Sequence, residues 1–349
     1  MAGPYYCDYA NGLDTNTGLS EALAFKTVQK ASTVVADGEI VYIQSGTTYD
    51  EATVPTITNI GVQWIGYTTT IADGGTAKID AGTNSIASCL KINQTTGAND
   101  SHVRNLELTG GTSHGVDFNR TGGGLNSRHI VDNCWIHANG GAGIVSDTHG
   151  IIVSRSEIDN NTGDGCNFGL GAQGHRLINS KVHDNGGLGV VSTGAAVLVN
   201  SEVYDNAQEG VSLTTGGGTL VNSTVHDNGT TGDDGAYGNA LVLVACGLTD
   251  NFRYNANTTL VGMSFNSGFN GAGTADTNGT WIAVEDVTSA PSYAGATDFT
   301  AGTAGWKGVT LEIGVVSGTH AQATSTLDIG SIQQAAGGMR LAGKGGLAA

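Results

Sequence analysis

The segment SKVHDN at residues 180–185 returns as SEVYDN at 201–206 and as STVHDN at 223–228. Two earlier versions, CWIHAN at 134–139 and SEIDNN at 156–161, extend the series, so that successive starts are 22, 24, 21 and 22 residues apart. Each version has a small residue, a free position, Ile or Val, another free position and a final pair that ends in Asn and is polar in all but CWIHAN. A repeat with a fixed period indicates similar structural units stacked on one another.

Apolar and polar positions alternate within each unit, which is the period of a β-strand and not of a helix. In SEVYDN, Val203 is expected to point to one side, and Glu202 and Tyr204 to the other. A second apolar run precedes the segment and a third follows it, as VLV at 197–199 and GVS at 210–212 do. Turn-forming Gly, Asn, Asp and Ser fill the gaps. Each unit therefore has about three short strands and no room for an ordinary helix.

One coil of this kind cannot bury its apolar face alone, but stacked coils can, because each strand then pairs in parallel with its counterpart in the next coil. The sequence therefore predicts a parallel β-solenoid with coils about 4.8 Å apart. The expected inward column is Ile136, Ile158, Val182, Val203 and Val225. A second column, in which stacked amides can hydrogen-bond to one another, is Asn139, Asn161, Asn185, Asn206 and Asn228.

Three further stretches fit the same architecture, namely YYCDYANGLDTNTGLSEALAFKTVQKA at 5–31, DGEIVYIQSGTTYDE at 37–51 and VRNLELTGG at 103–111. Together with the repeat, they resemble the right-handed parallel β-helix superfamily, the pectate-lyase-like fold. The resemblance covers about residues 5–270. It implies an all-β, right-handed parallel β-helix (solenoid) with an N-terminal capping helix. It indicates a fold and not an activity, because this fold hosts lyases, hydrolases, adhesins and viral spikes.

The expected organisation has four parts. Residues 1–36 form an N-terminal cap with a short helix, for which Phe25, Val28, Ala31 and Val35 have helical spacing. Residues 37–270 form the β-helix, and 271–333 form a C-terminal extension of irregular strands. Residues 334–349 form a Gly/Ala-rich tail, either flexible or docked on a neighbouring subunit.

Composition limits the partners. The chain has 349 residues, with 14 basic against 31 acidic side chains and a net charge of −17. Nucleic-acid binding needs a basic surface and is therefore not expected. The negative charge suits cations or neutral glycans instead. The five cysteines are odd in number and lack CxxC spacing, so buried free thiols are expected.

The N-terminal stretch MAGPYYCDYANG has neither the basic nor the apolar region of a signal peptide. The sequence also lacks an apolar run of about 18 residues, so no membrane insertion is expected. The Thr-, Asn- and Gly-rich, Lys-poor composition is nevertheless typical of extracellular proteins. We therefore expect a virion-associated, extracellular or cell-surface location.

Candidate functional residues lie on the outward columns. Carbohydrate binding or a subunit interface is predicted for the exposed aromatic and histidine positions Trp135, His137, His183, Tyr204 and His226. Asp164 and Glu209 interrupt the repeat just before a strand-opening Gly and are candidates for the same role. Asp184, Asp205 and Asp227 form an acidic ladder that could bind Ca²⁺. The alternative interpretation of this ladder is that each Asp hydrogen-bonds the local backbone of a tight turn.

No lyase or polygalacturonase motif is recognisable, so no catalytic residue is predicted and no cofactor other than Ca²⁺ is expected. The favoured function is a structural or adhesive β-helix, namely a virion spike, fibre or decoration protein that contacts a polysaccharide or its own subunits as a homo-oligomer. One alternative is a polysaccharide lyase or glycoside hydrolase of the phage depolymerase type. The other is a bacterial surface adhesin or filament subunit.

Overall fold

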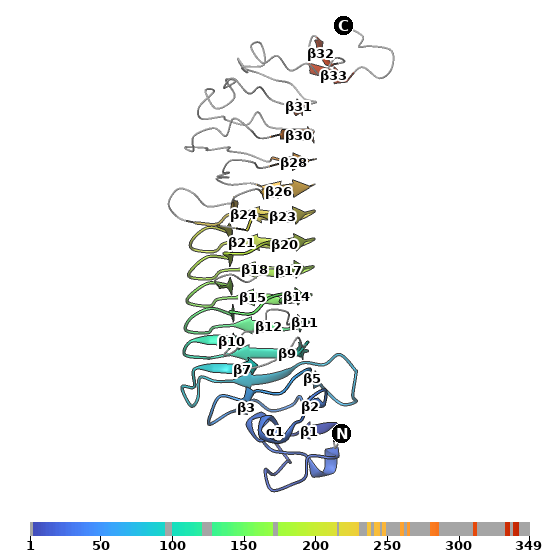
Figure 1. Cartoon of the computed structure of the whole chain (residues 1–349), viewed down its shortest axis with the longest axis vertical. Helices are drawn as coiled ribbons and strands as arrows, with labels where there is room; N and C mark the ends of the chain where they lie inside the picture. Colours follow the sequence, from blue (N-terminus) through green and yellow to red (C-terminus); the bar gives the residue numbers. More distant parts are fainter. Residues whose placement is uncertain are drawn as a thin grey trace.

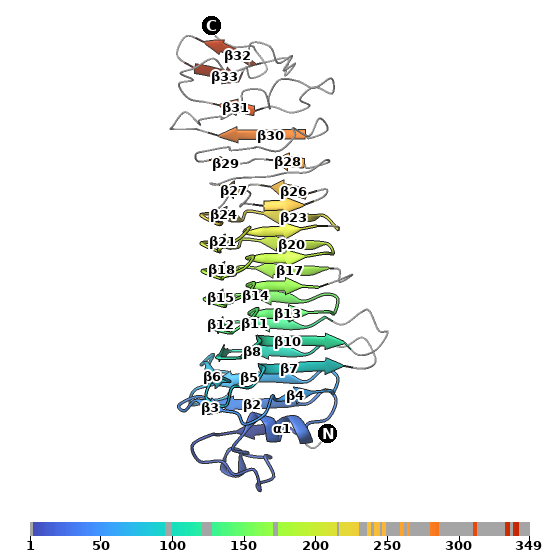
Figure 2. The same cartoon turned by 90° about the vertical axis from the view of Figure 1, so that its left-hand side faces the viewer.

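The computed structural model describes residues 3–94, 100–120, 128–169, 174–214 and 216–229. Beyond residue 229 it describes the strands given below and Cys246. The coils stack along one axis, starting from the N-terminal cap, and their strands form three parallel sheets (Figure 1). The view turned by 90° shows the same ladder from the side (Figure 2). The predicted right-handed parallel β-helix is confirmed.

From β2 to β25, each coil contributes one strand to each sheet, in the order sheet A, sheet B, sheet C. Sheet A consists of β1 (Tyr5–Cys7), β2 (Ile40–Gln44), β5 (Gln63–Tyr67), β8 (His102–Arg104), β11 (Ile130–Asp132), β14 (Ile152–Ser154), β17 (His175–Ile178), β20 (Ala196–Val199), β23 (Gly218–Val221), β26 (Leu241–Val244), β28 (Thr259–Val261), β30 (Thr280–Glu285) and β31 (Thr310–Glu312). Sheet B consists of β3 (Tyr49–Asp50), β6 (Ala77–Asp80), β9 (Leu106–Thr109), β12 (Trp135–His137), β15 (Glu157–Asp159), β18 (Lys181–His183), β21 (Glu202–Tyr204), β24 (Thr224–His226), β27 (Gly247–Leu248) and β29 (Ser264–Phe265). Sheet C consists of β4 (Thr56–Ile57), β7 (Ser88–Gln94), β10 (His114–Arg120), β13 (Ile144–Ser146), β16 (Cys166–Phe168), β19 (Val190–Ser192), β22 (Val211–Leu213) and β25 (Ala236–Gly238).

Two left-handed bends shape the coils of β12, β15, β18, β21 and β24, one on either side of the sheet B strand. The bend before the strand holds, for example, Asn179 and Asn200, with φ of 50° and 49°. The bend after it holds Asp184 and Asp205, with φ of 53° and 51°. Asn and Asp tolerate this region better than other residues with a Cβ. The repeated polar pairs of the sequence are therefore the corners of the coils.

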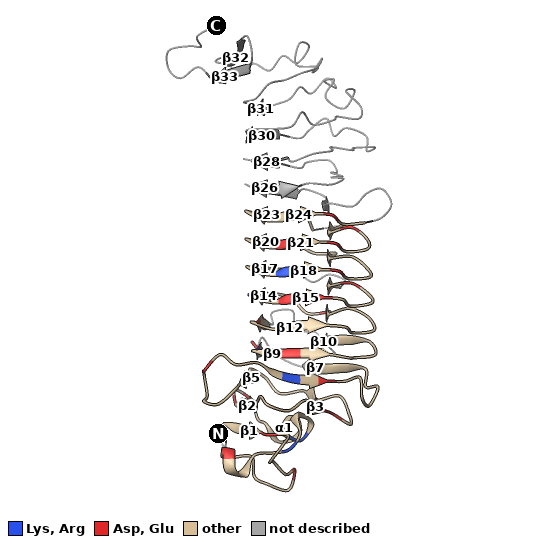
Figure 3. Ribbon diagram, turned by 180° about the vertical axis from the view of Figure 1, so that it is seen from behind, with Lys and Arg blue, Asp and Glu red and all other residues tan. Residues whose placement is uncertain are grey.

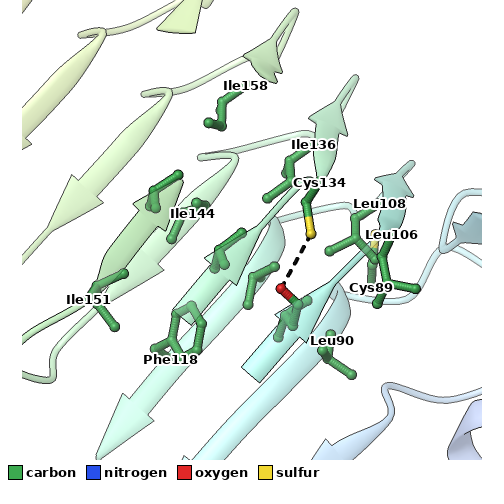
Figure 4. Packing of buried hydrophobic residues seen from close by; sticks show 14 of the residues in the cluster. Cys89, Leu90, Leu106, Leu108, Phe118, Cys134, Ile136, Ile144, Ile151 and Ile158 are labelled. Carbon is green, nitrogen blue, oxygen red and sulfur yellow. Dashed lines mark hydrogen bonds between the residues drawn. The ribbon is translucent and has the colours of Figure 1, made fainter. Parts of the chain in front are cut away.

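The predicted inward column is confirmed. Ile136, Ile158, Val182, Val203 and Val225 pair in register along sheet B and are fully buried. Burying each such side chain stabilises the fold by about 1.5–3 kcal/mol. Figure 4 shows two of them, Ile136 and Ile158, in the core with apolar side chains of the other sheets and with Cys134. The Sγ atom of Cys134 lies 3.5 Å from the Val103 carbonyl oxygen. All five cysteines are buried thiols, as predicted.

The asparagine column is also confirmed and forms a buried ladder at the corner after sheet B. The Nδ2 atom of Asn161 donates to Asn185 Oδ1 at 2.9 Å, and Asn185 Nδ2 donates to Asn206 Oδ1 at 2.9 Å. Each amide also binds backbone groups, as Asn185 Nδ2 does with the carbonyl oxygens of Ile158 and His183. Glycine immediately precedes four sheet C strands, β13, β16, β19 and β22. A Cβ on Gly165, for example, would collide with Val182 and the Asn185 amide. The ladder satisfies buried corner groups that would otherwise destabilise the fold.

His129 and His175 lie inside the solenoid. Both are fully buried and stack on Phe118 and Phe168, with ring centroids 4.9 Å and 4.3 Å apart. The Nδ1 atom of His175 accepts a hydrogen bond from the Ile151 N–H, while its Nε2 atom has no hydrogen-bond partner. Burial lowers the pKa of both imidazoles to about 4. They are therefore neutral core residues.

The N-terminal cap contains η1 (Glu21–Leu23) and the helix α1 (Val28–Val34). Thr27 caps this helix by accepting a hydrogen bond from Lys30 N, and the buried Glu51 carboxylate accepts one from Val28 N at 2.7 Å. Burial raises the pKa of Glu51 to about 7. The predicted capping helix is confirmed, but Phe25 does not belong to it. This side chain lies before α1, is buried, and its backbone bridges to Cys7.

At the C-terminal end, β30 and β31 continue sheet A in parallel, and β32 (Ile332–Ala335) pairs antiparallel with β33 (Gly338–Leu341). The predicted boundaries at residues 36, 270 and 333 and the role of the tail stay predictions. In the part of the chain that the structure describes, no helix has the length and apolar character needed to cross a membrane.

Candidate functional site

The outer face of sheet B carries two columns of side chains on either side of the buried aliphatic column. The first column, in register from β6 to β24, is Lys78, Glu107, Trp135, Glu157, Lys181, Glu202 and Thr224. The second, from β9 to β24, is Thr109, His137, Asp159, His183, Tyr204 and His226. Every predicted aromatic and histidine candidate therefore lies on one continuous face, which we call the sheet B face.

Rings stack along this face. Tyr204 is sandwiched between His183 and His226, with centroid distances of 4.6 Å and 5.1 Å and nearly parallel planes. Trp135 stacks on His137 at 3.9 Å. The two stacks differ in solvent exposure. Both faces of the Tyr204 ring are covered, whereas the Trp135 side chain is 42% exposed. Trp135 is the ring of these stacks that is best placed to meet a ligand.

A glutamate in one coil meets a histidine in the next at three levels. The Nε2 atom of His137 lies 3.2 Å from Glu107, that of His183 lies 3.0 Å from Glu157, and that of His226 lies 3.3 Å from Glu202. Each pair joins the first column diagonally to the second. We call these three contacts the Glu–His pairs.

Two of these histidines have a carboxylate on each ring nitrogen. Asp184 Oδ2 lies 2.8 Å from His183 Nδ1, and Asp227 Oδ2 lies 2.7 Å from His226 Nδ1. Burial disfavours the charged form of both imidazoles, but their hydrogen bonds with carboxylates outweigh it and raise the pKa of His183 and of His226. The sheet B face therefore favours positively charged histidine rings between negative groups.

Trp135 is fixed by an acidic neighbour in the next coil. Its Nε1 atom donates a hydrogen bond to Asp159 Oδ1 at 2.6 Å, and Asp159 Oδ2 accepts one from Asn160 Nδ2 at 2.5 Å. Asp159 is only 6% exposed, although it points outward, because these neighbours cover it. The indole plane is thus held in place at the surface.

Acidic groups dominate the sheet B face. Figure 3 shows this side of the molecule, with red on β9, β15 and β21 and blue on β18. Lys78 pairs with Glu107 at 2.9 Å and Lys181 pairs with Glu202 at 3.1 Å, so that neither ammonium pairs with Glu157 in these contacts. The exposed Glu157 is the least neutralised carboxylate of the three Glu–His pairs.

The three predicted calcium ligands, Asp184, Asp205 and Asp227, occupy the left-handed corners after sheet B and are exposed. Asp184 and Asp227 each bind the preceding histidine. Within the described residues, the group of three whose potential ligand atoms lie within 4.8 Å of one another is Glu157, Asp159 and His183. It contains none of the three aspartates, so calcium binding by them stays a prediction.

The other two candidates, Asp164 and Glu209, lie at the approach to sheet C and not on the sheet B face. Asp164 accepts hydrogen bonds from Leu188 N at 2.9 Å and from Asn167 Nδ2 at 2.7 Å. Its carboxylate therefore supports the turn of the following coil. The Glu209 carbonyl oxygen accepts a bond from Gly189 N. A binding role for either side chain stays a prediction.

The first column contains the predicted candidate Trp135, but its three glutamates, Glu107, Glu157 and Glu202, were not predicted as site residues. The signal was present, because alternation within SEIDNN places Glu157 and Asp159 on the same side of one strand. Glu157 and His183 are 26 residues apart, which is one coil plus two positions. An alignment of equivalent positions in the repeat therefore does not reveal that these two side chains meet.

Comparison with known proteins agrees with this architecture. The family model described as a right handed beta helix region matches residues 92–252. A pectate lyase, Pel9A, is 18% identical in sequence and superimposes with a TM-score of 0.53, covering 86% of this chain and 82% of that one. No curated protein sequence matches the chain.

Two further structures superimpose less well. The A-module of the Azotobacter vinelandii mannuronan C-5 epimerase AlgE4 is 15% identical, with a TM-score of 0.44 over 75% of this chain and 84% of that one. A rhamnogalacturonan lyase is 12% identical, with a TM-score of 0.46 over 83% and 88%. At these scores neither adds to the argument. The chain has the right-handed parallel β-helix fold, which the family model matches over residues 92–252 and which Pel9A shares.

Proposed function

We propose that this chain is a structural, adhesive β-helix protein that binds a neutral polysaccharide on its sheet B face, at Trp135. One observation carries the proposal. An indole that is 42% exposed lies flat on His137 and is fixed from the side by Asp159. Amphipathic rings of this kind bind the apolar faces of sugars. The carboxylates beside it can accept hydrogen bonds from sugar hydroxyls.

Charge supports a neutral ligand. The chain carries a net charge of −17, and Glu107, Glu157 and Glu202 line the face beside the aromatic rings. A polyanionic glycan would be repelled by these groups, and this repulsion would be strongest at low salt. We infer an extracellular setting for this adhesive role, with a virion spike, fibre or decoration protein as the first possibility and a bacterial adhesin as the next.

The test is glycan binding by the full chain, measured by affinity electrophoresis in gels that contain neutral or acidic polysaccharides. Trp135→Ala should abolish the retardation, with a loss of about tenfold or more in affinity for one lost stacking ring. Leu23→Ala is the matched control, because Leu23 is an exposed apolar side chain of the N-terminal cap, 48% exposed. Equal retardation of both variants would contradict the proposed site.

A second candidate, polysaccharide cleavage, has its own support. Glu157 and Asp159 place two carboxylates beside Trp135, and glycosidases act with paired carboxylates. The compared structure with the TM-score of 0.53 is a pectate lyase, which makes pectate the first acidic substrate to test. Release of unsaturated or reducing ends that Glu157→Gln abolishes would favour this enzymatic role over the adhesive one.

The outer face of sheet A is the proposed contact surface between copies of the chain in a homo-oligomer. Ile178, Val199 and Val221 form one outward column there, in register and only half-buried. Such a column suits contact with a second copy of the chain. Val199→Glu should lower the mass measured by light scattering from that of an oligomer to that of a single chain. A wild-type chain that is monomeric at all concentrations would contradict the oligomer.

A further inference from the structure

One group on the sheet B face has the composition of a metal site. Glu157 and Asp159 come from β15 and His183 from β18, and a ligand atom of each lies within 4.8 Å of the others. We propose that Glu157, Asp159 and His183 bind a divalent cation of the Zn²⁺ class. The proposal is independent of the glycan-binding role, because it needs no sugar.

The hydrogen bonds of His183 point to a cation. Its Nδ1 atom lies 2.8 Å from Asp184 Oδ2, and its Nε2 atom lies 3.0 Å from Glu157 Oε1. Carboxylates only accept hydrogen bonds, so the ring needs a positive species at each nitrogen. A proton on Nδ1 serves Asp184, and a metal ion can replace the second proton between Nε2 and Glu157. A carboxylate behind a ligating histidine is the usual outer support of such a ligand.

The third ligand is already oriented. Asp159 is held by the Trp135 indole at 2.6 Å and by the Asn160 amide, and it pairs in register with His183. Both Asp159 and His183 are nearly buried, at 6% and 8% exposure, whereas Glu157 is exposed. Two ligands are thus fixed by their surroundings and the third can close on the ion. A remaining coordination position would face solvent beside Trp135, as in sites with three protein ligands and an open fourth position.

The ligand types select the metal. Ca²⁺ takes oxygen ligands only, whereas imidazole nitrogen together with carboxylate oxygen is typical of Zn²⁺ and its neighbours. The two carboxylates outweigh a neutral imidazole in charge, and Lys181 is drawn away to Glu202. A divalent cation therefore meets a local excess of negative charge.

The same face provides two internal controls. The Glu107–His137 and Glu202–His226 pairs have nearly the same spacing as Glu157–His183. At the position that pairs in register with the histidine, however, they have Thr109 and Tyr204 in place of Asp159. A Glu–His pair without the second carboxylate offers two ligands and not three. The repeat itself therefore shows what is particular to this coil.

The experiment is a calorimetric titration of the full chain, stripped of metal by a chelator, with zinc chloride alone. The matched variants are Glu157→Gln and Glu107→Gln, which remove the same carboxylate from the proposed site and from a control pair that does not hold Lys181. We expect zinc affinity to fall by about a hundredfold in the first variant and to stay within about twofold in the second. Equal affinities in both variants, or no zinc binding by the wild-type chain, would overturn the proposal.

A second readout places the ion. Ni²⁺ or Cu²⁺ bound next to Asp159 should quench the fluorescence of Trp135, because its indole contacts this ligand. The quenching should disappear in Asp159→Asn and in Trp135→Phe, and should persist in Glu107→Gln. If Asp159→Asn does not fold, as judged by circular dichroism, the exposed Glu157→Gln decides alone. Quenching that Glu157→Gln leaves unchanged would place the ion elsewhere and contradict the site.

Discussion

Histidine occurs on both sides of the solenoid wall and behaves oppositely on the two sides. Inside, His175 stacks on Phe168 with one nitrogen unpaired, and burial lowers its pKa to about 4. Outside, His226 stacks on Tyr204 between Glu202 and Asp227. Burial again disfavours its charged form, but the two carboxylates outweigh burial and raise its pKa. Both rings stack on an aromatic neighbour, so stacking is not the cause of the difference.

The difference lies in the partners that each side of a strand can recruit. Inward side chains meet apolar chains from all three sheets. A polar group there finds its partners within the wall, as the asparagine ladder does, or stays unpaired and neutral, as His175 Nε2 does. Outward side chains meet charged neighbours one coil away, and these exposed contacts contribute little to stability. Stability should therefore depend on the inner ladders, and binding on the outer columns.

The largest expected effect breaks the inner ladder. Asn185→Leu removes the acceptor of Asn161 N and Asn161 Nδ2 and the donor to the Ile158 carbonyl. Each buried group left without a partner costs about 1–3 kcal/mol, so the free energy of unfolding should fall by about 5 kcal/mol in urea denaturation. Lys181→Ala, on the outer face of the same coil, should change it by less than about 0.5 kcal/mol. Equal losses in both variants would contradict the division between inside and outside.

This division also explains what could be predicted from the sequence. Columns such as Ile136–Val225 and Asn139–Asn228 recur at one position in each unit, so their period alone predicts them. Phe25 could not be placed correctly, because helical spacing continues one turn upstream of the actual N-cap at Thr27. In the Glu157–Asp159–His183 group, two residues lie on one strand, and His183 lies in the next coil, in register with Asp159 and diagonal to Glu157. Its geometry depends on side-chain rotamers, which the repeat does not encode.

The next effect sharpens the contrast through the inner histidine. A pKa lowered from 6.5 to about 4 means that the unfolded chain binds the proton first as the pH falls. The stability contributed by neutral His175 is complete above pH about 6.5 and is lost progressively toward pH about 4, by about 3 kcal/mol. His175→Phe keeps the stack on Phe168 but has no group there that binds a proton. Between pH about 6.5 and pH about 4, its free energy of unfolding should therefore fall by about 3 kcal/mol less than that of the wild type.

His129→Phe is the parallel test, because His129 has the same environment against Phe118 and the same lowered pKa. Urea denaturation at a series of pH values measures both variants. A pH profile identical to that of the wild type in both would mean that neither ring is neutral in the folded core.

The smallest effect has the opposite sign and comes from the outer face. A raised pKa means that folded His226 binds its proton more tightly than the unfolded chain does. Its contribution is fully present below pH about 6.5 and is lost as the pH rises through the folded pKa. His226→Gln should therefore destabilise the chain more at acidic than at alkaline pH, whereas His175→Phe should be relatively stabilising at acidic pH. Both are measured with a chelator present, so that metal bound near His183 does not contribute. If the pH changed the stability of both variants in the same direction, the carboxylates around His226 would not be the cause of the difference between the two histidines.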